Sequence, residues 1–546
     1  MPAANAAVRP EGAIEASFAA GASPRDEAPA AGAPWRDRLW DIAPALTTLL
    51  LLAIYPLLRY FPREPFIAEV FRLAFIAFWV GSLILSMIRA LKTRAAVLAN
   101  LEERWLDRLR VEARTPGHYL VLMPLKAETN RHVLYQALRA VERQRYPHER
   151  ITVIPIVEAE DAATRQRLDE LLPHFATRLD VRPFIYPTAH LPARCKATSV
   201  STAGRWLRPQ VEAGAFGTDG VRMLLIDADT ILHPEDLACR EYHHQAAEAR
   251  WLPQGFRAVV LQSLTTYTAN YWKVPMLPRL HNTGFVLYQM GRMQGRGDYL
   301  ILGPGMSLGF EALAAVDYFE PNRHNEDMQF RYKVVMEGYR VVPLRIPTWG
   351  QAPLTTRESW CQIARWARGA VDAKFVVRHR RIYPAGRRPF MRTKPFLAAR
   401  ALLANAAAPL MVLLPTQLIL ISWLSPCVSD LWPFPVFLSP DVLALKLGTR
   451  SLCVSAVAAF NLRFQTIVLT SSMLLGMLLA PHLLRPIIYG RPPRRWRGGR
   501  RFLEWFRLVF TPLNLHNYLL MATAQVYTQA RLALGFDITR TPVTRK

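Results

Sequence analysis

Two aspartates one residue apart are the residues best suited to chemistry in this sequence. They are Asp227 and Asp229 in the segment LLIDADTILHP, residues 224–234, where an apolar run of strand-forming residues ends. Alternate side chains of a strand share one face, so we expect the two carboxylates to point to one place. Neighbouring anions raise each other's pKa unless a cation lies between them. A magnesium or manganese ion, which takes oxygen ligands and keeps positions open for phosphates, fits this pattern. The alternative is a solvated Asp-x-Asp turn without a ligand.

Two segments further along the chain carry other groups suited to catalysis. Residues 324–344, HNEDMQFRYKVVMEGYRVVPL, place Glu326 and Asp327 before a predicted helix, whose N-terminus favours anions. A carboxylate there that faces a nucleotide and its metal is a candidate general base, although both residues are also ordinary helix-capping groups. Residues 300–313, LILGPGMSLGFEAL, predict a strand, a glycine-rich turn and a helix start, where backbone can approach a ligand closely.

A third segment, SWCQIARWARG at residues 359–369, predicts a helical face with three useful groups. Gln362, Arg365 and Trp366 are spaced i, i+3 and i+4, so their side chains lie on one side of the helix. A guanidinium suits a diphosphate, and an indole suits stacking on a sugar ring or a nucleoside. The alternative is a structural amphipathic helix on a membrane surface.

Alternating strands and helices from residue 118 onward would position these segments. The predicted strands are residues 119–125, 151–157 and 181–186 and the run that ends at Asp227, and the predicted helices are residues 130–145, 163–173 and 195–206. Such alternation implies right-handed crossovers and a mostly parallel sheet, with ligands bound at the carboxyl ends of the strands. Asp227 and Asp229 lie at such an end.

Composition limits the classes of partner. The 546-residue chain is 51% hydrophobic and has a net charge of +26, so it can hold more than one domain and bury a large core. Its basic residues gather beside apolar segments, which is typical of a cytoplasmic membrane surface, and we expect no nucleic acid as a partner. The five cysteines have no metal-ligand spacing and are predicted to be reduced.

Apolar runs on both sides of the α/β region predict membrane helices. Residues 42–60, 73–91, 396–423 and 464–484 are about long enough to cross a bilayer, residues 431–447 are a weaker candidate, and residues 505–534 either span or lie in the interface. The alternative for the first pair is two buried core helices. We therefore expect an integral protein of the plasma (inner) membrane, with a cytoplasmic catalytic domain and the lipid bilayer as a partner.

The order of the motifs resembles that of a known enzyme family. DAD, then ED before a helix, then QxxRW before apolar segments resembles the membrane-integrated family 2 glycosyltransferases, the group that includes cellulose and hyaluronan synthases. The resemblance covers about residues 118–370 and, more loosely, the flanking segments. It implies a GT-A-type α/β fold, inverting transfer from a nucleotide-sugar donor, with a UDP-sugar favoured, and a divalent metal, magnesium or manganese.

The resemblance also implies roles for individual residues. Asp227 and Asp229 would hold the metal on the donor's diphosphate, and Asp327 would take the proton from the acceptor hydroxyl. The expected donor-binding residues are Glu128, Glu158, Asp161, Lys196, Asp227, Gln362 and Arg365. The expected acceptor-binding residues are Gly303, Glu326 and Trp366.

Three departures from the family pattern concern the acceptor and processivity more than the donor. They are Asn325 in place of the threonine of the TED motif, the missing end of the KxxALN-like segment after Lys196, and LIL before Gly303 in place of FFC.

The sequence predicts six parts and one leading function. The parts are a disordered cytoplasmic tail (residues 1–34), two transmembrane helices (35–95), a GT-A-type catalytic domain inserted between N- and C-terminal transmembrane helices (96–355), amphipathic interface helices with QxxRW (356–395), C-terminal transmembrane or interface helices (396–535) and a basic tail (536–546). The expected function is extension of a polysaccharide, processive and coupled to export, on a carbohydrate or lipid-linked acceptor, with secretion subunits as candidate partners. The alternatives are single addition to a lipid-linked acceptor, or a non-catalytic membrane transport or scaffold subunit.

Overall fold

A computed structural model provides the structure of the chain in part. It describes residues 39, 42–43, 45–53, 65–128, 130–188, 195–217, 220–295, 297–320, 326–366, 372–379, 382–383, 392–403, 484–490, 523–524, 526–531 and 534. The predicted tails (residues 1–34 and 536–546) and the candidate spans at residues 431–447 and 464–483 lie outside the described residues.

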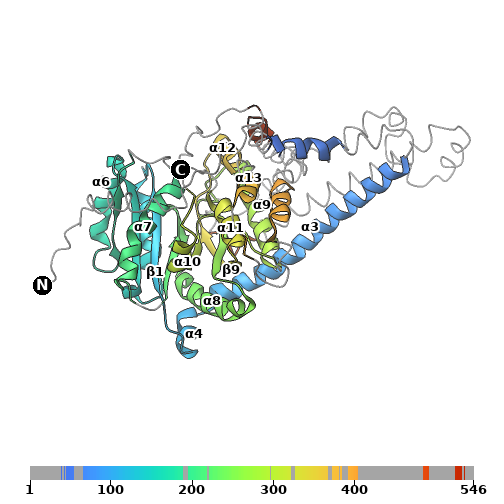
Figure 1. Ribbon diagram of the computed structural model, residues 1–546. Helices are drawn as coiled ribbons and strands as arrows, with labels where there is room; N and C mark the ends of the chain where they lie inside the picture. Colours follow the sequence, from blue (N-terminus) through green and yellow to red (C-terminus); the bar gives the residue numbers. More distant parts are fainter. Residues whose placement is uncertain are drawn as a thin grey trace, which may run out of the picture.

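One mixed sheet forms the centre of the described part of the chain (Figure 1). Its strands are β1 (His118–Leu125), β2 (Ile151–Glu158), β3 (Asp180–Val181), β4 (Phe184–Tyr186), β5 (Val221–Leu225), β6 (Ile231–Leu232), β7 (Val259–Thr266), β8 (Met306–Gly309) and β9 (Arg340–Trp349). They lie in the order β3-β2-β1-β5-β8-β7-β9-β6, and β4 pairs with β2. β1 is parallel to β2 and β5, whereas β8 is antiparallel to β5 and β7. The expected α/β fold is confirmed.

Side-chain alternation along β1 divides the core between the two faces of the sheet. Leu120 and Leu122 belong to one buried apolar cluster, and Tyr119, Val121 and Met123 belong to the other. Helices α7 (Lys196–Glu212) and α9 (Met276–Met293) add to the first cluster, and α5 (Arg131–Glu142) and α8 (Asp236–Trp251) add to the second. A sheet covered on both faces explains why its strands are near-continuous apolar runs in the sequence.

The other helices connect the strands and extend the domain. They are α3 (Pro65–Glu102), α4 (Trp105–Val111), α6 (Ala162–Leu171), α10 (Phe310–Ala315), α11 (Glu326–Met336), α12 (Thr356–Trp366) and α13 (Asp372–Arg378). The predicted strand at residues 181–186 is instead two short strands, β3 and β4. Pro183 lies between them, and a proline has no N–H to donate to a neighbouring strand.

Helix α3 shows why the expected membrane helices need correction. It contains the predicted span at residues 73–91, but its C-terminal half lies against the α/β domain (Figure 1). Ala90 and Val97 are buried in the same apolar cluster as Met290 of α9, and Thr93 Oγ1 donates a hydrogen bond to the Met290 carbonyl. Apolar residues that cover a core have the same hydropathy as residues that face lipid. Hydropathy therefore assigned residues 73–91 to a membrane.

No helix within the described ranges has both the length and the apolar character needed to cross a bilayer. The expected flanking transmembrane helices, and with them the expected integral localisation in the plasma (inner) membrane, are therefore wrong for this part of the chain.

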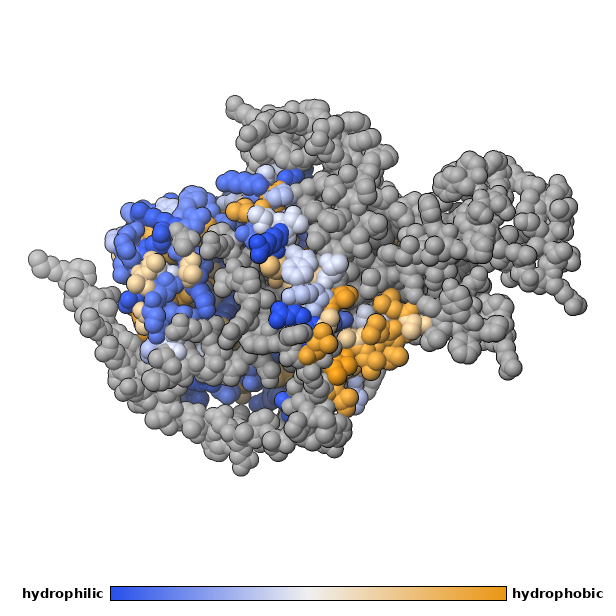
Figure 2. All heavy atoms as spheres, turned by 90° about the horizontal axis from the view of Figure 1, so that it is seen from above, coloured by the Kyte–Doolittle hydropathy of each residue, from blue (hydrophilic) through white to orange (hydrophobic). Residues whose placement is uncertain are grey.

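Apolar side chains are nevertheless exposed on two helical segments. They include Leu46, Leu49 and Leu50 near the N-terminus and Ile84 and Ile88 on α3. Seen from above, apolar side chains gather in one area, whereas hydrophilic side chains cover the side of the molecule that carries α6 and α7 (Figure 2). The exposed apolar surface is thus unevenly distributed over the described residues.

Candidate active site

The two predicted metal-binding aspartates lie in a turn and not in a strand. β5 ends at Leu225, and in the following turn the Asp227 N–H donates to Thr230 Oγ1 while the Thr230 N–H donates to the Asp227 carbonyl. Asp229 is 5% exposed, and its Oδ2 accepts a hydrogen bond from the Gln351 N–H at 3.0 Å, just after β9. The turn, and not strand alternation, therefore sets the directions of the two carboxylates.

Asp227 is paired with Lys196, the first residue of α7. Lys196 Nζ lies 2.5 Å from Asp227 Oδ1, and the two side chains are 23% and 26% exposed. Burial lowers the pKa of the Lys196 ammonium, but the carboxylates of Asp227, Glu326 and Asp327 act in the opposite direction and the net effect is a raised pKa. A charged lysine is thus held among three carboxylates that come from distant parts of the sequence.

The glycine-rich turn brings Lys196 and Asp327 to one place. Gly303 has a φ of +80°, in the left-handed region that favours glycine. A Cβ on Gly303 would lie 3.4 Å from Lys196 Nζ and 3.7 Å from Asp327 Oδ2. The lysine and the candidate base therefore flank one glycine. We call Lys196, Asp227, Gly303 and Asp327 the Lys196 cluster.

Asp327 lies beside Glu326 in the first turn of α11, where both are partly buried. Its Oδ1 accepts a hydrogen bond from the Met328 N–H at 2.8 Å. Burial and the charge of Glu326 raise the pKa of Asp327 from 3.8 to about 7, although Lys196 and the Met328 N–H act in the opposite direction. A carboxyl group with a pKa near neutrality is well matched to accepting a proton from a hydroxyl.

Asp227 and Asp229 are carboxylates of the kind that would hold a divalent metal with a phosphate as a further ligand. Among the described residues, no cluster of three or more His, Cys, Asp or Glu side chains could hold an ion by itself. Two carboxylates nevertheless suit magnesium or manganese, because such ions keep several positions for water and substrate phosphates. Asp227 and Asp229 would therefore hold a metal jointly with a diphosphate.

Helix α12 carries the predicted Gln362, Arg365 and Trp366. Gln362 is 2% exposed, and its Oε1 has no hydrogen-bond partner in the described part of the protein. The Trp366 ring stacks on Phe285 with centroids 5.4 Å apart and lies 5.7 Å from the ring of Tyr267. The side chain of Arg365 lies outside the described residues. Trp366 is therefore part of an aromatic cluster, and Gln362 Oε1 is a candidate contact for a ligand.

Asp161, predicted to bind the donor, is engaged in local structure. Its carboxylate caps α6 by accepting from the Thr164 N–H, and its Oδ2 accepts from the Ala127 N–H at 2.7 Å. Burial raises the pKa of Asp161, but these hydrogen bonds and the Thr164 hydroxyl outweigh burial and lower the pKa. Asp161 thus holds the turn after β1, where Ala127 has a φ of +51°.

The same turn carries Glu128 and Lys126, which no sequence motif singled out. The Glu128 N–H donates to Thr164 Oγ1 at 3.0 Å, which fixes this residue over α6. Lys126 Nζ lies 3.4 Å from Oε1 of Glu158, another predicted donor-binding residue, which is 8% exposed at the end of β2. The only sequence signal for Lys126 is its place directly after a buried strand.

One protein-family model matches part of the chain. Residues 223–479, just under half of the chain, match the model described as glycosyl transferase family group 2. This match includes the aspartate pair, the Gly303 turn, Asp327 and α12. It supports the resemblance to family 2 glycosyltransferases and the enzyme class, and the chain is a glycosyltransferase. No protein of curated function matches the chain significantly.

Solved structures give distant similarities. The mannosyltransferase PcManGT from Pyrobaculum calidifontis, in complex with GDP-Man and Mn²⁺, is 16% identical, with a TM-score of 0.38 and coverage of 70% of this chain and 98% of that chain. TarS 1-349 from S. aureus is 12% identical, with a TM-score of 0.32 and coverage of 78% and 93%.

Proposed function

We propose that this glycosyltransferase transfers a sugar from a nucleoside-diphosphate-sugar donor to a carbohydrate acceptor, with inversion at the anomeric carbon. The observation that supports the proposal most strongly is the Lys196 cluster, in which Lys196 pairs with Asp227 and lies, together with the candidate base Asp327, beside Gly303. These are the groups that a displacement of diphosphate by a hydroxyl needs, and they come from four separate segments of the sequence.

The donor half of the proposal concerns the leaving group. A metal held by Asp227 and Asp229 would supply positive charge for the diphosphate. The Lys196 ammonium lies 2.5 Å from Asp227 and adds a second positive charge at the same place. Fixed charges directed at a developing anion stabilise the transition state without reorganisation, so Lys196 would lower the barrier to departure of the nucleoside diphosphate.

The acceptor half of the proposal concerns Asp327. Its carboxylate would take the proton of the acceptor hydroxyl as the hydroxyl oxygen bonds to the anomeric carbon. The bond from that carbon to the diphosphate oxygen breaks at the same time, on the opposite face of the sugar, which gives inversion. Gly303, having no side chain, would leave room for the acceptor beside Asp327, and the Trp366 indole would stack on a sugar ring.

We further propose a UDP-sugar as the donor and repeated addition to a polysaccharide, as in the cellulose and hyaluronan synthase group. The QxxRW segment on α12, with Gln362 buried and Trp366 in an aromatic group, supports this extension. Single addition to a lipid-linked acceptor is the alternative.

The test is a donor screen with the purified full-length protein. UDP-, GDP- and dTDP-sugars are incubated with magnesium or manganese, released nucleoside diphosphate is measured, and products are sized. We expect metal-dependent turnover of at least one donor, and long products if addition is repeated. Products one sugar longer than the acceptor would favour single addition, whereas no turnover of any donor would contradict the proposed function and favour a non-catalytic scaffold.

A further inference from the structure

Behind the Lys196 cluster, residues 302–305 form a tight turn that joins two parts of the site. Gly303 and Gly305 both have a φ of +80° and flank Pro304. The Gly305 N–H donates to the Leu225 carbonyl at 2.8 Å, two residues before Asp227. The turn therefore connects the end of β5, which leads into Asp227 and Asp229, with Gly303, which lies beside Lys196 and Asp327.

Gln262 of β7 holds this turn from both sides of Gly303. The side chain is fully buried. Its Oε1 accepts from the Leu302 N–H at 3.1 Å, and its Nε2 donates to the Pro304 carbonyl at 2.9 Å. The hydroxyl of Thr265 donates to the same carbonyl at 3.0 Å. One amide thus satisfies a backbone donor and a backbone acceptor that lie on either side of the glycine.

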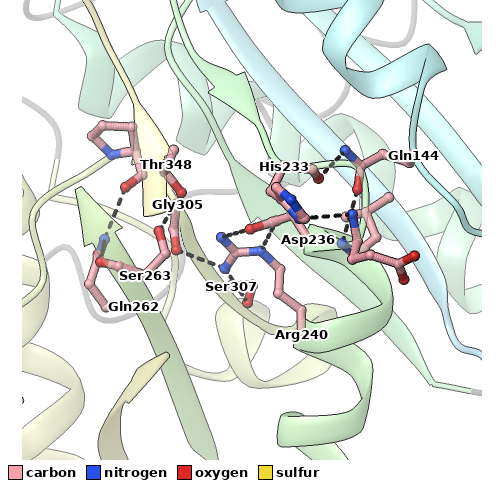
Figure 3. Close-up of polar contacts among 12 residues, drawn as sticks. Gln144, His233, Asp236, Arg240, Gln262, Ser263, Gly305, Ser307 and Thr348 are labelled. Atoms are coloured by element: carbon pink, nitrogen blue, oxygen red, sulfur yellow. Dashed lines mark hydrogen bonds and ion pairs between the residues drawn. The ribbon is translucent and has the colours of Figure 1, made fainter. Parts of the chain in front are cut away.

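The far end of the turn is anchored by a buried ion pair (Figure 3). Arg240 and Asp236, both fully buried on α8, are 2.5 Å apart, and Arg240 Nη1 donates to the Gly305 carbonyl at 2.8 Å. A buried charge that lost its partner would be costly, so this pair has little freedom to move. A Cβ on Gly305 would lie 1.9 Å from Ser263 Oγ, so the backbone is also packed tightly against β7.

We propose that Gln262 is a positioning residue for sugar transfer, because it fixes the turn that places Gly303 beside Lys196 and Asp327. The inference rests on the proposed function and extends it. With Gly305 anchored by Arg240 and by β5, the remaining freedom of the turn lies at Leu302 and Pro304, the two residues that Gln262 binds. A displacement of about 1 Å in a catalytic arrangement can cost roughly 10²-fold in rate.

The experiment compares Gln262→Met with Gln144→Met. Gln144 is a matched control because it is also a buried glutamine with both amide ends bonded: Nε2 donates to the Ala140 and His233 carbonyls, and Oε1 accepts from the Leu237 N–H (Figure 3). None of these hydrogen bonds of Gln144 involves a residue of the turn at residues 302–305. Both variants remove one buried amide, so similar losses of stability are expected.

We measure kcat, the donor KM and the affinity for the nucleoside diphosphate in each folded variant. Gln262→Met is expected to lower kcat about 10²-fold with the donor KM and the nucleoside diphosphate affinity within about threefold of wild type. Gln144→Met is expected to keep kcat close to the wild-type value. A general loss of packing would not separate kcat from KM in this way.

Thr265→Val serves as a second variant if Gln262→Met does not fold. It keeps the β-branched shape and removes the hydroxyl that donates to the Pro304 carbonyl and accepts from Gln262 Nε2. It should lower kcat by less than Gln262→Met, with KM again unchanged. Equal kcat in Gln262→Met and Gln144→Met, or a wild-type kcat in Thr265→Val, would overturn the positioning role. Absence of turnover in the wild-type protein would instead contradict the proposed function, so the two failures are distinguishable.

Discussion

Lys196 Nζ lies 2.5 Å from Asp227 Oδ1, so the first aspartate of the pair is already bonded to a cation that the protein itself supplies. Two carboxylates one residue apart repel each other, and the ammonium offsets part of that repulsion. A metal arriving with a diphosphate would therefore meet a site whose negative charge is shared with Lys196. This contact makes Lys196 the residue that links Asp227 to the surroundings of Asp327.

Lys196→Met should weaken donor use. The change removes a charge-assisted contact of the kind worth about 1.5–3 kcal/mol, so we expect kcat/KM for the donor to fall by roughly tenfold to 10²-fold. Arg208→Gln is the control, because Arg208 also lies on α7 but pairs with Glu212 at the surface. Steady-state kinetics of both variants test this, and equal values in the two would contradict the role of Lys196.

Activity should depend on pH through Asp327. The pKa of this carboxyl is raised to about 7, so at lower pH the group is protonated and cannot accept the acceptor's proton. We expect the rate to fall by about tenfold per pH unit below this pKa. Ionisation of a carboxyl with a raised folded-state pKa also costs stability as pH rises between its unfolded value of 3.8 and about 7.

Two measurements check this pH dependence. A rate profile in constant metal should bend near neutrality, and a flat profile down to about pH 5 would speak against the assignment. In addition, the melting temperature of Asp327→Asn relative to wild type should be higher at pH values above neutrality than in acid, because asparagine does not ionise.

Gly303→Ala should lose activity while keeping most of its stability. An alanine in the left-handed region costs about 1–2 kcal/mol, and its Cβ would enter the space between Lys196 and Asp327. Gly255→Ala is the matched control, since Gly255 has a φ of +85° and no atom within 4 Å of its would-be Cβ. Thermal unfolding should give similar losses for both variants, whereas only Gly303→Ala should lose transfer. If Gly303→Ala retained transfer activity, the acceptor would not bind in the space beside Gly303.

Metal removal should stop turnover. Chelation is expected to abolish donor use, and added magnesium or manganese should restore it. Asp227→Asn should raise the metal concentration needed for half-maximal activity by about tenfold or more, the effect of losing one carboxylate ligand. Asp317→Asn is the control, because Asp317 is an exposed aspartate paired with Arg205. Full activity of the wild-type protein in excess chelator would exclude the metal role of Asp227.

The strand and helix pattern could be predicted from the sequence because buried strands are continuous apolar runs and amphipathic helices have a regular period. The resemblance placed Lys196 only near the nucleotide, and its contact with Asp227 was not predicted, since no local pattern connects α7 with the end of β5. Asp227 and Asp229 were expected on a strand, but their place in a turn depends on Thr230 and Gln351, which alternation does not reveal.

Other features depend on contacts that no spacing encodes. Asp161 was expected at the donor, yet its hydrogen bond to Ala127 depends on a left-handed backbone that sequence alone does not disclose. No motif distinguishes Gln262 within its apolar strand, and only the fold brings its side chain to the Gly303 turn. The apolar residues near Ala90 were assigned to a membrane because hydropathy does not tell which surface covers them.

The most direct test of the account is Asp327→Asn, assayed for both donor binding and transfer. We predict that the variant binds the donor and metal with nearly wild-type affinity but loses transfer by roughly 10²- to 10⁴-fold, the usual contribution of a general base. Near-wild-type transfer by Asp327→Asn would contradict the assignment of the base and, with it, the account of the Lys196 cluster as the site of sugar transfer.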